Sequence, residues 1–283
     1  MRSESTSLPT ISVVTPSFNQ ARYLRETLAS VAAQTYPAHE HIVMDGGSTD
    51  GSVEVLREWG PRPGFQWHSG RDRGQSDAIN KGVALATGEI VGWLNSDDLL
   101  YDGALDAIAR AFAAQPDAGV VYGTGEKMDP EGRTVKIIPA VPYDARRLRS
   151  AFYVLQPSMF FRRALFQQVG GLDENSHYAM DWELLLKLAR IAPVIGIPDP
   201  VGRLRVYGET KSNTGGWARM REIANIGRRM HGPLDRNWLS LRIREIVARI
   251  RPAPLGRLAR KIVDATMRRT LGEKNFMVQG WPS

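Results

Sequence analysis

Short apolar runs alternate with helical patterns along the first 125 residues, and this alternation restricts the fold more than any other feature. The runs that predict strands are 10–15, 41–44, 65–68, 89–94 and 120–122. The segments with helical spacing of apolar residues are 21–34, 52–59, 74–86 and 102–114. Such alternation is typical of an α/β fold with a mostly parallel central sheet flanked by helices. Ligands bind beyond the carboxyl ends of such strands, so the residues that follow each strand are the candidate site.

The second half of the chain continues with strands and helices in a less regular order. Strands are predicted at 133–138, 158–162 and 194–197, with a helix at 181–191. Past residue 212 the pattern is helical only. We therefore predict an N-terminal tail at 1–9, one main α/β domain at 10–211 and a helical extension at 212–283.

The absence of cysteine narrows the chemistry. The 283 residues include none, which excludes disulfides, thiolate metal sites and cysteine nucleophiles. The first ten residues lack the apolar core of a signal peptide, and no apolar run approaches the roughly 18 residues that span a membrane. We expect a cytoplasmic protein, with peripheral attachment at the inner face of the membrane if its extension binds there.

The positive charge gathers near the C-terminus. The net charge is +7, and residues 236–269 alone carry ten basic against two acidic residues, so the remainder is close to neutral. Apolar residues among these arginines suit a helix lying on an anionic membrane surface. A helical extension packed on the main domain is the alternative. No nucleic acid is expected as a partner, because no recognition module is present.

Two adjacent aspartates, Asp97 and Asp98, follow the apolar run 90–94. Like charges side by side cost energy unless a cation or hydrogen bonds offset the repulsion. Mg²⁺ and Mn²⁺ are commonly held by one or two carboxylates together with a substrate diphosphate. The pair therefore predicts a site for a divalent cation and a diphosphate. The alternative is a turn whose aspartates cap the helix that begins near Asp102.

Polar residues also follow the second and third predicted strands. In the loop 45–50, Asp45 can accept a hydrogen bond from a base or a ribose, or the loop can simply cap the next helix. In the segment 69–82, Arg71 or Arg73 can neutralise phosphate, or both can be solvated surface charges. No GxxxxGK[ST] and no GxGxxG occur, so the P-loop and the dinucleotide fingerprint are absent.

Three blocks taken together resemble glycosyltransferase family 2. They are "ISVVTPSFNQARYLRETLASVAAQTYPAHEHIVMDGGSTDGS", "DRGQSDAINKGVALATGEIVGWLNSDDLL" and "GGLDENSHYAMDWELLLKLA", which cover roughly residues 10–210 in the family's order and spacing. The resemblance implies a GT-A type nucleotide-sugar-binding fold over the catalytic domain 10–211, with the nucleotide-binding half at about 10–125 and the acceptor half at about 126–211. It further implies inverting sugar transfer that depends on Mn²⁺ or Mg²⁺. It also implies a nucleoside-diphosphate sugar donor, with a UDP-sugar favoured, and a glycan or lipid-linked acceptor. Surface polysaccharide or lipid-linked oligosaccharide assembly would be the setting.

The same resemblance suggests roles for individual residues. The loop after the first strand would pack around the nucleotide, Asp45 would occupy the first of two acidic positions, and an arginine would contact the diphosphate. The residues matched to this nucleotide side are Pro16, Phe18, Asn19, Asp45, Arg73 and, less closely, Arg71.

On the sugar side, the resemblance makes Asp97 a sugar or ribose contact and Asp98 the metal ligand. Asp181 matches the catalytic base, and as it opens a predicted helix, the helix dipole favours its ionised form. It would take the proton from the acceptor hydroxyl.

Four positions depart from the family pattern. Gly46 replaces a second Asp that contacts the base, Asn95 replaces an Asp, Met180 replaces a Glu and Tyr207 replaces a His. These exchanges weaken the inference about nucleotide identity, the number of acidic groups and metal binding.

Neighbours of Asp181 are candidates for the acceptor side. Trp182 can stack on a sugar ring or pack in the core, whereas His177 and Tyr178 can shape the acceptor pocket or lie in a surface loop. Gln156 is a further candidate for the border of that site.

Two other functions remain open from the sequence. One is a non-catalytic relative that binds a nucleotide sugar. The other is a nucleotidyltransferase of similar sheet architecture, although the basic glycine-rich loop expected near its N-terminus is missing.

Overall fold

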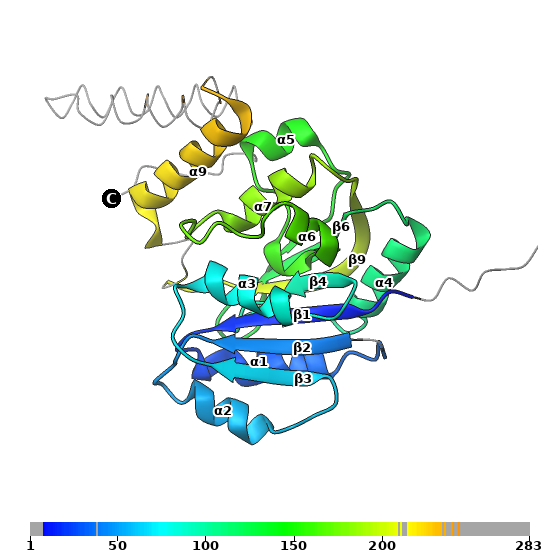
Figure 1. Cartoon of the computed structure of the whole chain (residues 1–283), viewed down its shortest axis with the longest axis vertical. Coiled ribbons are helices and arrows are strands. Elements are labelled where there is room, and N and C mark those ends of the chain that lie inside the picture. The colour runs from blue at the N-terminus through cyan, green and yellow to red at the C-terminus, as the bar shows by residue number, and fades with distance from the viewer. Residues whose placement is uncertain are drawn as a thin grey trace, which may run out of the picture. The chain divides into compact units, whose positions relative to one another are not determined.

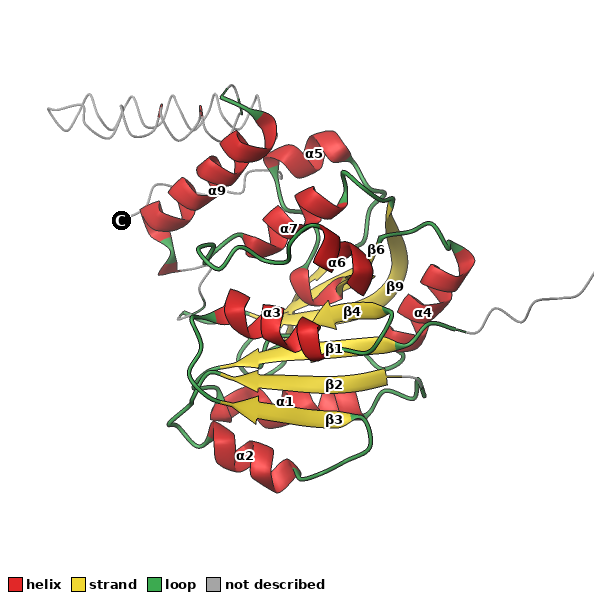
Figure 2. Cartoon of the chain, viewed as in Figure 1, coloured by secondary structure: helices red, strands yellow, loops and turns green. Residues whose placement is uncertain are grey.

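The first half of the chain forms a parallel sheet with helices between its strands (Figures 1 and 2). The computed structural model describes residues 8–37, 39–208, 210, 214–233, 235, 239 and 243. Four strands lie in the order β3-β2-β1-β4, and all neighbouring pairs among them are parallel. They are β1 (Ile11–Ser17), β2 (His39–Asp45), β3 (Phe65–Ser69) and β4 (Ile90–Trp93). The helices are α1 (Ala21–Ala32), α2 (Ser52–Trp59) and α3 (Gln75–Leu85).

Alternating side chains of β1 determine which helix covers which face of the sheet. Val13 packs in the main core cluster with Val31 of α1. Its neighbour Val14 points to the opposite face, where α3 lies. A Cβ at Gly82 of α3 would come 2.4 Å from Val14 Cγ1, so glycine allows the helix to approach the sheet closely. The sheet is therefore covered on both faces, as a parallel sheet requires.

The second half of the sheet is mixed. The order continues as β8-β6-β9-β5, with β7 beside β6. β8 is antiparallel to both β4 and β6, whereas β6 and β9 are parallel. The elements are β5 (Leu99–Leu100), α4 (Ala104–Ala114), β6 (Val120–Met128), β7 (Thr134–Ile138), a 3-10 turn η1 (Gln156–Ser158), β8 (Met159–Arg162), α6 (Arg163–Gln168) and β9 (Val194–Arg205). The predicted α/β architecture is confirmed. The mostly parallel pattern holds for the first half only, because β8 enters the sheet antiparallel between β4 and β6, and β7 returns antiparallel along β6.

Strands extend beyond the apolar runs that predicted them, and the extensions of β1 and β9 carry residues of the site. β1 continues through Pro16 and Ser17, which pair with Met44 and Asp45, so Pro16 does not break the strand. β9 continues to Arg205, eight residues beyond the predicted end at 197. Polar residues such as Arg203 lie within this strand, which is why the sequence pattern ended it early. The extension carries Arg205 to β6, where it pairs with Met128.

The chain divides into two compact units. The first contains 1–143, 154–175 and 187–207, and includes the whole sheet. The second groups 144–153 and 176–186 with the segment from residue 208 onward. Its described helices are α5 (Ala145–Ser150), α9 (Gly216–His231) and most of α7 (Met180–Leu188).

Much of the predicted basic extension lies outside the described residues, including all ten basic residues between 236 and 269. Its two interpretations therefore stay predictions. Of the helices that the structure describes, none has both the length and the apolar character needed to cross a membrane.

Candidate active site

The loops that follow the four parallel strands are joined by hydrogen bonds. The strands β1 to β3 point the same way in Figure 1, so their carboxyl ends share one edge. The loop after β1 contacts the loop after β2, since Asn19 Oδ1 accepts from Thr49 N at 2.9 Å and Asn19 N donates to Ser48 Oγ at 2.8 Å. At the start of α3, Gln75 Nε2 donates to Asn95 Oδ1 beyond β4 at 2.7 Å. The structure thus gathers the predicted polar residues of this half at one edge.

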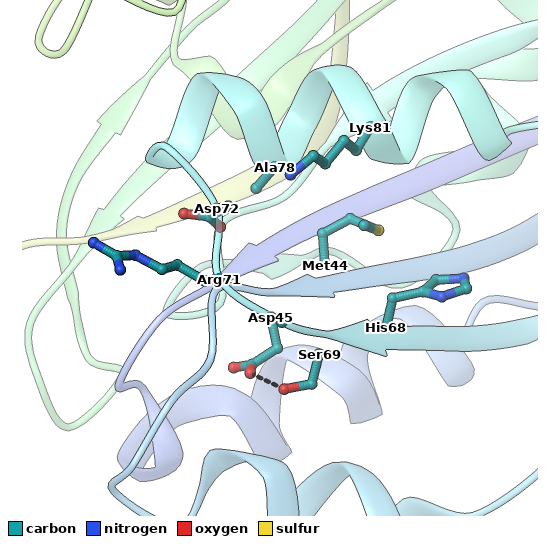
Figure 3. Close-up of a pocket in the computed structure, with 9 residues that line it drawn as sticks. Met44, Asp45, His68, Ser69, Arg71, Asp72, Ala78 and Lys81 are labelled. Carbon is teal, nitrogen blue, oxygen red and sulfur yellow. Dashed lines mark hydrogen bonds between the residues drawn. The ribbon is translucent and has the colours of Figure 1, made fainter.

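Asp45 organises its own loop. Its buried carboxylate accepts hydrogen bonds from the backbone N–H groups of Gly47 and Ser48, both at 3.1 Å, and from the hydroxyl of Ser48 at 2.5 Å. The hydroxyl of Ser69 also donates to it, at 2.7 Å (Figure 3). Four donors leave this side chain little capacity for a ligand. Asp45 therefore shapes the nucleotide-side loop, and the predicted direct contact to a base stays a hypothesis.

Phe18 and Asp72 both lie close to Gly46. Pro16 is buried in β1, but the Phe18 ring just beyond is 61% exposed. A Cβ at Gly46 would come 2.8 Å from Asp72 Oδ2 and 3.2 Å from Phe18 Cδ2. The place of a side chain at position 46 is therefore already taken by the carboxylate of Asp72. This is a physical reason for the glycine where relatives would carry a second aspartate.

The two candidate arginines differ in their surroundings. Arg71 is exposed and lines a cavity of about 170 Å³ together with Asp45, Asp72 and Lys81 (Figure 3). Arg73 is engaged, with its Nη2 at 3.2 Å from Asp77 Oδ1 and 2.7 Å from Glu174 Oε2. Arg71 is thus the arginine that is open to a phosphate, whereas Arg73 braces the start of α3.

The aspartate pair forms a tight turn after β4, and its two carboxylates have different surroundings. Asp98 is fully buried, its Oδ1 accepting from Arg205 N at 2.8 Å and its Oδ2 from Asn95 Nδ2 at 3.0 Å. Asp97 is partly exposed and accepts from the hydroxyl of Tyr207 at 2.7 Å. Of the two, Asp97 is the carboxylate that a ligand can reach.

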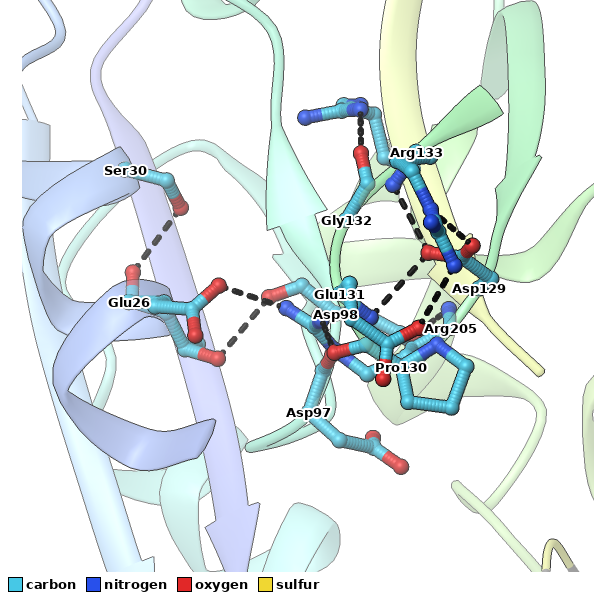
Figure 4. A network of polar contacts seen from close by, with 12 residues as sticks. Glu26, Ser30, Asp97, Asp98, Asp129, Pro130, Glu131, Gly132, Arg133 and Arg205 are labelled. Carbon is cyan, nitrogen blue, oxygen red and sulfur yellow. Dashed lines mark hydrogen bonds and ion pairs between the residues drawn. The ribbon is translucent and has the colours of Figure 1, made fainter. Parts of the chain in front are cut away.

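Arg205 fixes this turn from inside the protein. Its side chain is completely buried, donating from Nε to the carbonyl of Asp97 at 2.9 Å and from Nη1 to the carbonyl of Pro130 at 2.6 Å (Figure 4). Its Nη2 pairs with Glu26 of α1 at 2.7 Å, and its guanidinium lies 4.3 Å above the ring of Tyr23. A single cation therefore links the aspartate turn to α1 and to the β6–β7 connection.

The electrostatics of the pair favour a nearby positive charge. Burial raises the pKa of Asp97 and, more strongly, that of Asp98, where the charge of Asp97 adds to the effect. Hydrogen bonds and the charge of Arg205 act in the opposite direction. The balance is a carboxylate pair that Arg205 compensates only in part, and a bound cation would complete the compensation.

Amide side chains replace further acidic groups behind the pair. Asn95 donates both to Asp98 and to Gln156 Oε1, the latter at 3.1 Å, and Gln156 Nε2 donates to the carbonyl of Trp93 at 2.8 Å. An aspartate at position 95 would place oxygen against oxygen at both contacts. The network explains Asn95 structurally and puts Gln156 behind the aspartate turn.

Asp181 lies in the first turn of α7, in the second unit. Burial raises its pKa to about 6, while a hydrogen bond from Trp182 N and the charge of Arg219 hold the pKa down and the charge of Glu222 raises it. A carboxylate with a pKa near 6 is ionised at neutral pH and is still a useful proton acceptor. The group predicted to be the base therefore has the required chemistry.

The neighbours of Asp181 are mostly structural. Trp182 is fully buried, and its Nε1 donates to the carbonyl of Leu148 at 2.7 Å, so its ring packs in the core and offers no face to a sugar. His177 and Tyr178 donate their backbone N–H groups to Glu222. The side chain of His177 is exposed and that of Tyr178 is half-buried.

The aspartates after β4 fit a site in which the protein supplies only a few of the ligands of a divalent cation. Among the residues that the structure describes, no three His, Asp or Glu side chains are arranged to hold a metal. The donors after β4 are oxygens, as Mg²⁺ and Mn²⁺ prefer, and their charge is only partly compensated. Such a site needs a substrate diphosphate to complete the coordination.

Sequence reasoning missed Arg205, Glu26 and Glu222. An arginine in "RLRVYGETKS" looks like any basic residue near a strand end, and nothing in the sequence distinguishes the buried one. Only the structure shows that Arg205 and Tyr207, two residues apart, both contact Asp97.

Comparisons with known proteins agree with this geometry. The family model described as Glycosyl transferase family 2 matches residues 12–170. An uncharacterized glycosyltransferase of Mycobacterium tuberculosis is 36% identical over 198 residues, which are 68% of this chain and 73% of that protein. The O-antigen biosynthesis protein RfbC of Myxococcus xanthus is 32% identical over 212 residues, which are 73% of this chain and 16% of that protein.

A solved structure shares the fold. S. aureus TarS in complex with UDP-GlcNAc superposes with a TM-score of 0.65 at 19% identity, covering 95% of this chain and 89% of the TarS chain. The fold is therefore of the GT-A type. The chain belongs to glycosyl transferase family 2 and is a glycosyltransferase.

Proposed function

We propose that the protein is an inverting, cation-dependent glycosyltransferase that uses a nucleoside-diphosphate sugar, with a UDP-sugar favoured, and a hydroxyl acceptor. The observation that carries the proposal is the partly exposed carboxylate of Asp97 at the common edge of the parallel strands, backed by the buried Asp98 and Arg205. The UDP-GlcNAc bound to TarS supports a UDP-sugar. The name of RfbC supports a role in surface polysaccharide assembly.

In this proposal the nucleotide side comprises Phe18, Asn19 and Arg71. Phe18 offers an exposed ring on which a base can stack, and Arg71 offers its exposed positive charge to the diphosphate. Asp45 acts indirectly by holding its loop through four hydrogen bonds.

The roles of the two aspartates differ from those that the family resemblance suggested. Asp97 would hold Mn²⁺ or Mg²⁺ together with the donor diphosphate, whereas Asp98, enclosed by Asn95 and the backbone of Arg205, would keep the turn in place. When bound, the cation would offset the charge that develops on the leaving diphosphate. Tyr207 holds the Asp97 carboxylate in orientation through its hydroxyl.

Asp181 is the proposed base. It takes the proton of the acceptor hydroxyl as that oxygen bonds to the anomeric carbon, while the bond from this carbon to the diphosphate oxygen breaks. Displacement in one step inverts the anomeric configuration. Asp181 is neutral after the transfer and releases its proton to solvent, which its pKa of about 6 permits at neutral pH.

A thermal-shift panel tests the donor site. It compares UDP, GDP, CDP and dTDP with and without Mn²⁺ on the wild type, Asp97→Asn and the control Asp102→Asn, which changes an exposed carboxylate just after the pair. A ligand at 100 times its dissociation constant adds about 2.7 kcal/mol to the folded state. We expect a Mn²⁺-dependent shift with UDP that Asp97→Asn loses and Asp102→Asn keeps. No shift with any nucleotide would overturn the proposal.

Turnover is tested separately. With a UDP-sugar and a model acceptor, the product's anomeric configuration, read by NMR, should be opposite to that of the donor. Donor binding without any transfer or donor hydrolysis would instead indicate the non-catalytic relative.

A further inference from the structure

The loop that leads into α7 is held from a distant part of the chain. The carboxylate of Glu222, on α9, accepts hydrogen bonds from three successive backbone N–H groups, those of His177, Tyr178 and Ala179, at 2.9, 2.7 and 2.8 Å. These donors directly precede the first turn of α7, which contains Asp181. A charged acceptor that satisfies three N–H groups fixes a backbone more firmly than solvent does.

Other contacts keep α9 in register with this loop. Arg229 Nη2 pairs with Glu183 Oε1 at 3.1 Å, and Glu183 Oε2 accepts from the hydroxyl of Ser176 at 3.0 Å. At the other end of α9, a Cβ on Gly215 would come 2.8 Å from Tyr178 Cε1, so the helix approaches the loop as closely as glycine allows. The side of α9 that carries Glu222 is therefore built against this loop.

The charges that face Asp181 also come from α9. They are Arg219 and Glu222, which oppose each other in their effect on the carboxyl group. The Nε of Arg219 is buried and donates to none of the residues that the structure describes. A buried guanidinium N–H without a hydrogen-bonded partner is costly unless a negative charge lies nearby. Asp181 and Glu222 are such charges.

We propose that Glu222 is a positioning residue for Asp181, that Arg219 supplies the opposing charge, and that α9 carries these two residues to the base. The inference rests on the proposed role of Asp181 as the base. It assigns a function to a segment that the sequence indicated only as a basic helical extension.

Two variants of Glu222 separate geometry from charge. Glu222→Ala leaves three backbone N–H groups without their acceptor, so kcat should fall about 10- to 100-fold, because a small displacement of a catalytic group costs this much. The nucleotide thermal shift should be unchanged. Glu222→Gln keeps an acceptor oxygen and should recover much of kcat.

The pH profile of kcat/KM would not change in these variants if Glu222 and Arg219 had only a structural role. The acid limb reports protonation of Asp181. Glu222→Gln removes a negative charge near Asp181, so the acid limb should move to lower pH by about half a pH unit. Arg219→Met removes a positive charge near Asp181, so the acid limb should move to higher pH by about the same amount. The control Arg228→Met removes an exposed charge nine residues further along α9, about 13 Å away, and should leave the limb in place.

The outcomes separate this inference from the proposed function. Asp181→Asn should abolish transfer and keep the nucleotide shift, and an active Asp181→Asn variant would remove the base on which the inference rests. If Asp181→Asn is inactive while the acid limb stays fixed in both Glu222→Gln and Arg219→Met, the inference is overturned. Opposite shifts support it, and these two variants decide the matter even if Glu222→Ala does not fold.

Discussion

The hydroxyl of Tyr207 donates a hydrogen bond to Oδ2 of Asp97, with 2.7 Å between the two oxygens. Burial and the Asp97 charge raise the pKa of Tyr207 above its usual value, so the hydroxyl stays a donor at alkaline pH. Tyrosine thus occupies the position where the family pattern has histidine, and orients Asp97 instead of offering a ring nitrogen.

Removing the Tyr207 hydroxyl should lower the stability of the folded protein measurably. Tyr207→Phe leaves the partly buried Asp97 carboxylate short of a donor, so the free energy of unfolding should fall by about 1 kcal/mol. Urea denaturation with an unchanged m-value would measure it. The control Tyr153→Phe removes an exposed hydroxyl that accepts from Asp144 N and should cost less. Equal losses in the two variants would argue against a special role for Tyr207.

Substitution of Arg205 should destabilise the protein far more than substitution of an exposed arginine. Arg205→Met leaves Glu26 and the carbonyls of Asp97 and Pro130 without their buried donor, so unfolding free energy should fall by about 3–5 kcal/mol. The matched change Arg133→Met removes an exposed arginine that pairs with Asp129, for which about 1 kcal/mol or less is expected.

Chemical denaturation of both variants measures the difference. If Arg205→Met unfolds the protein, Arg205→Lys keeps the charge but loses the planar fork, and should still be destabilised well beyond Arg133→Met. If both Arg205→Lys and Arg205→Met lower the unfolding free energy by less than about 1 kcal/mol, Arg205 does not hold the aspartate turn in place.

The sequence predicted which loops lie together, because parallel strands place their carboxyl ends at one edge of the sheet. Asn19, Asp45 and Asp97 are far apart in the chain, yet the alternation of strands and helices was sufficient to bring their loops together. Hydrophobic spacing carries this information, because a strand buried on both faces is apolar throughout. The helix α2 was predicted with the same bounds as observed.

What the sequence did not predict depends on contacts between distant polar residues. Arg205 lies 107 residues from Asp98, and Glu222 lies 45 residues from His177. Polar side chains have no periodic signal that tells a buried partner from a solvated one. The same limit applies to the aspartate pair, because the sequence does not show that Asp98 is buried while Asp97 stays partly exposed.

Gly46 and Asp72 should behave as a coupled pair. Gly46→Asp would place a second carboxylate beside Asp72, so at pH 7 it should be less stable than the uncharged isostere Gly46→Asn by about 0.5–1 kcal/mol. In an Asp72→Asn background this difference should disappear, because the repelling charge is gone. Urea melts of the four variants form a double-mutant cycle. A difference that persists in the Asp72→Asn background would show that the repulsion does not come from Asp72, and would contradict the coupling.

His41 should make the stability depend on pH. It is buried in β2 with its Nε2 2.8 Å from the hydroxyl of Thr15, and burial, with a smaller effect of His39, lowers its pKa to about 3. Below about pH 6.5 the His41 imidazole binds a proton in the unfolded chain but stays neutral in the folded protein. The unfolding free energy should therefore fall as the pH decreases toward 3.

Comparison with His41→Gln isolates this contribution. The quantity to compare is the unfolding free energy of the wild type minus that of His41→Gln. It should be constant above about pH 7. Between about pH 6 and pH 4 it should fall by about 1.4 kcal/mol for each unit by which the pH decreases. His68→Gln, which alters an exposed histidine on the neighbouring strand β3, should give a much flatter difference. Urea titrations at pH 4, 5, 6, 7 and 8 measure both curves. A His41→Gln curve parallel to that of the wild type would mean that His41 takes up its proton without unfolding, and that the site around Thr15 admits the charge.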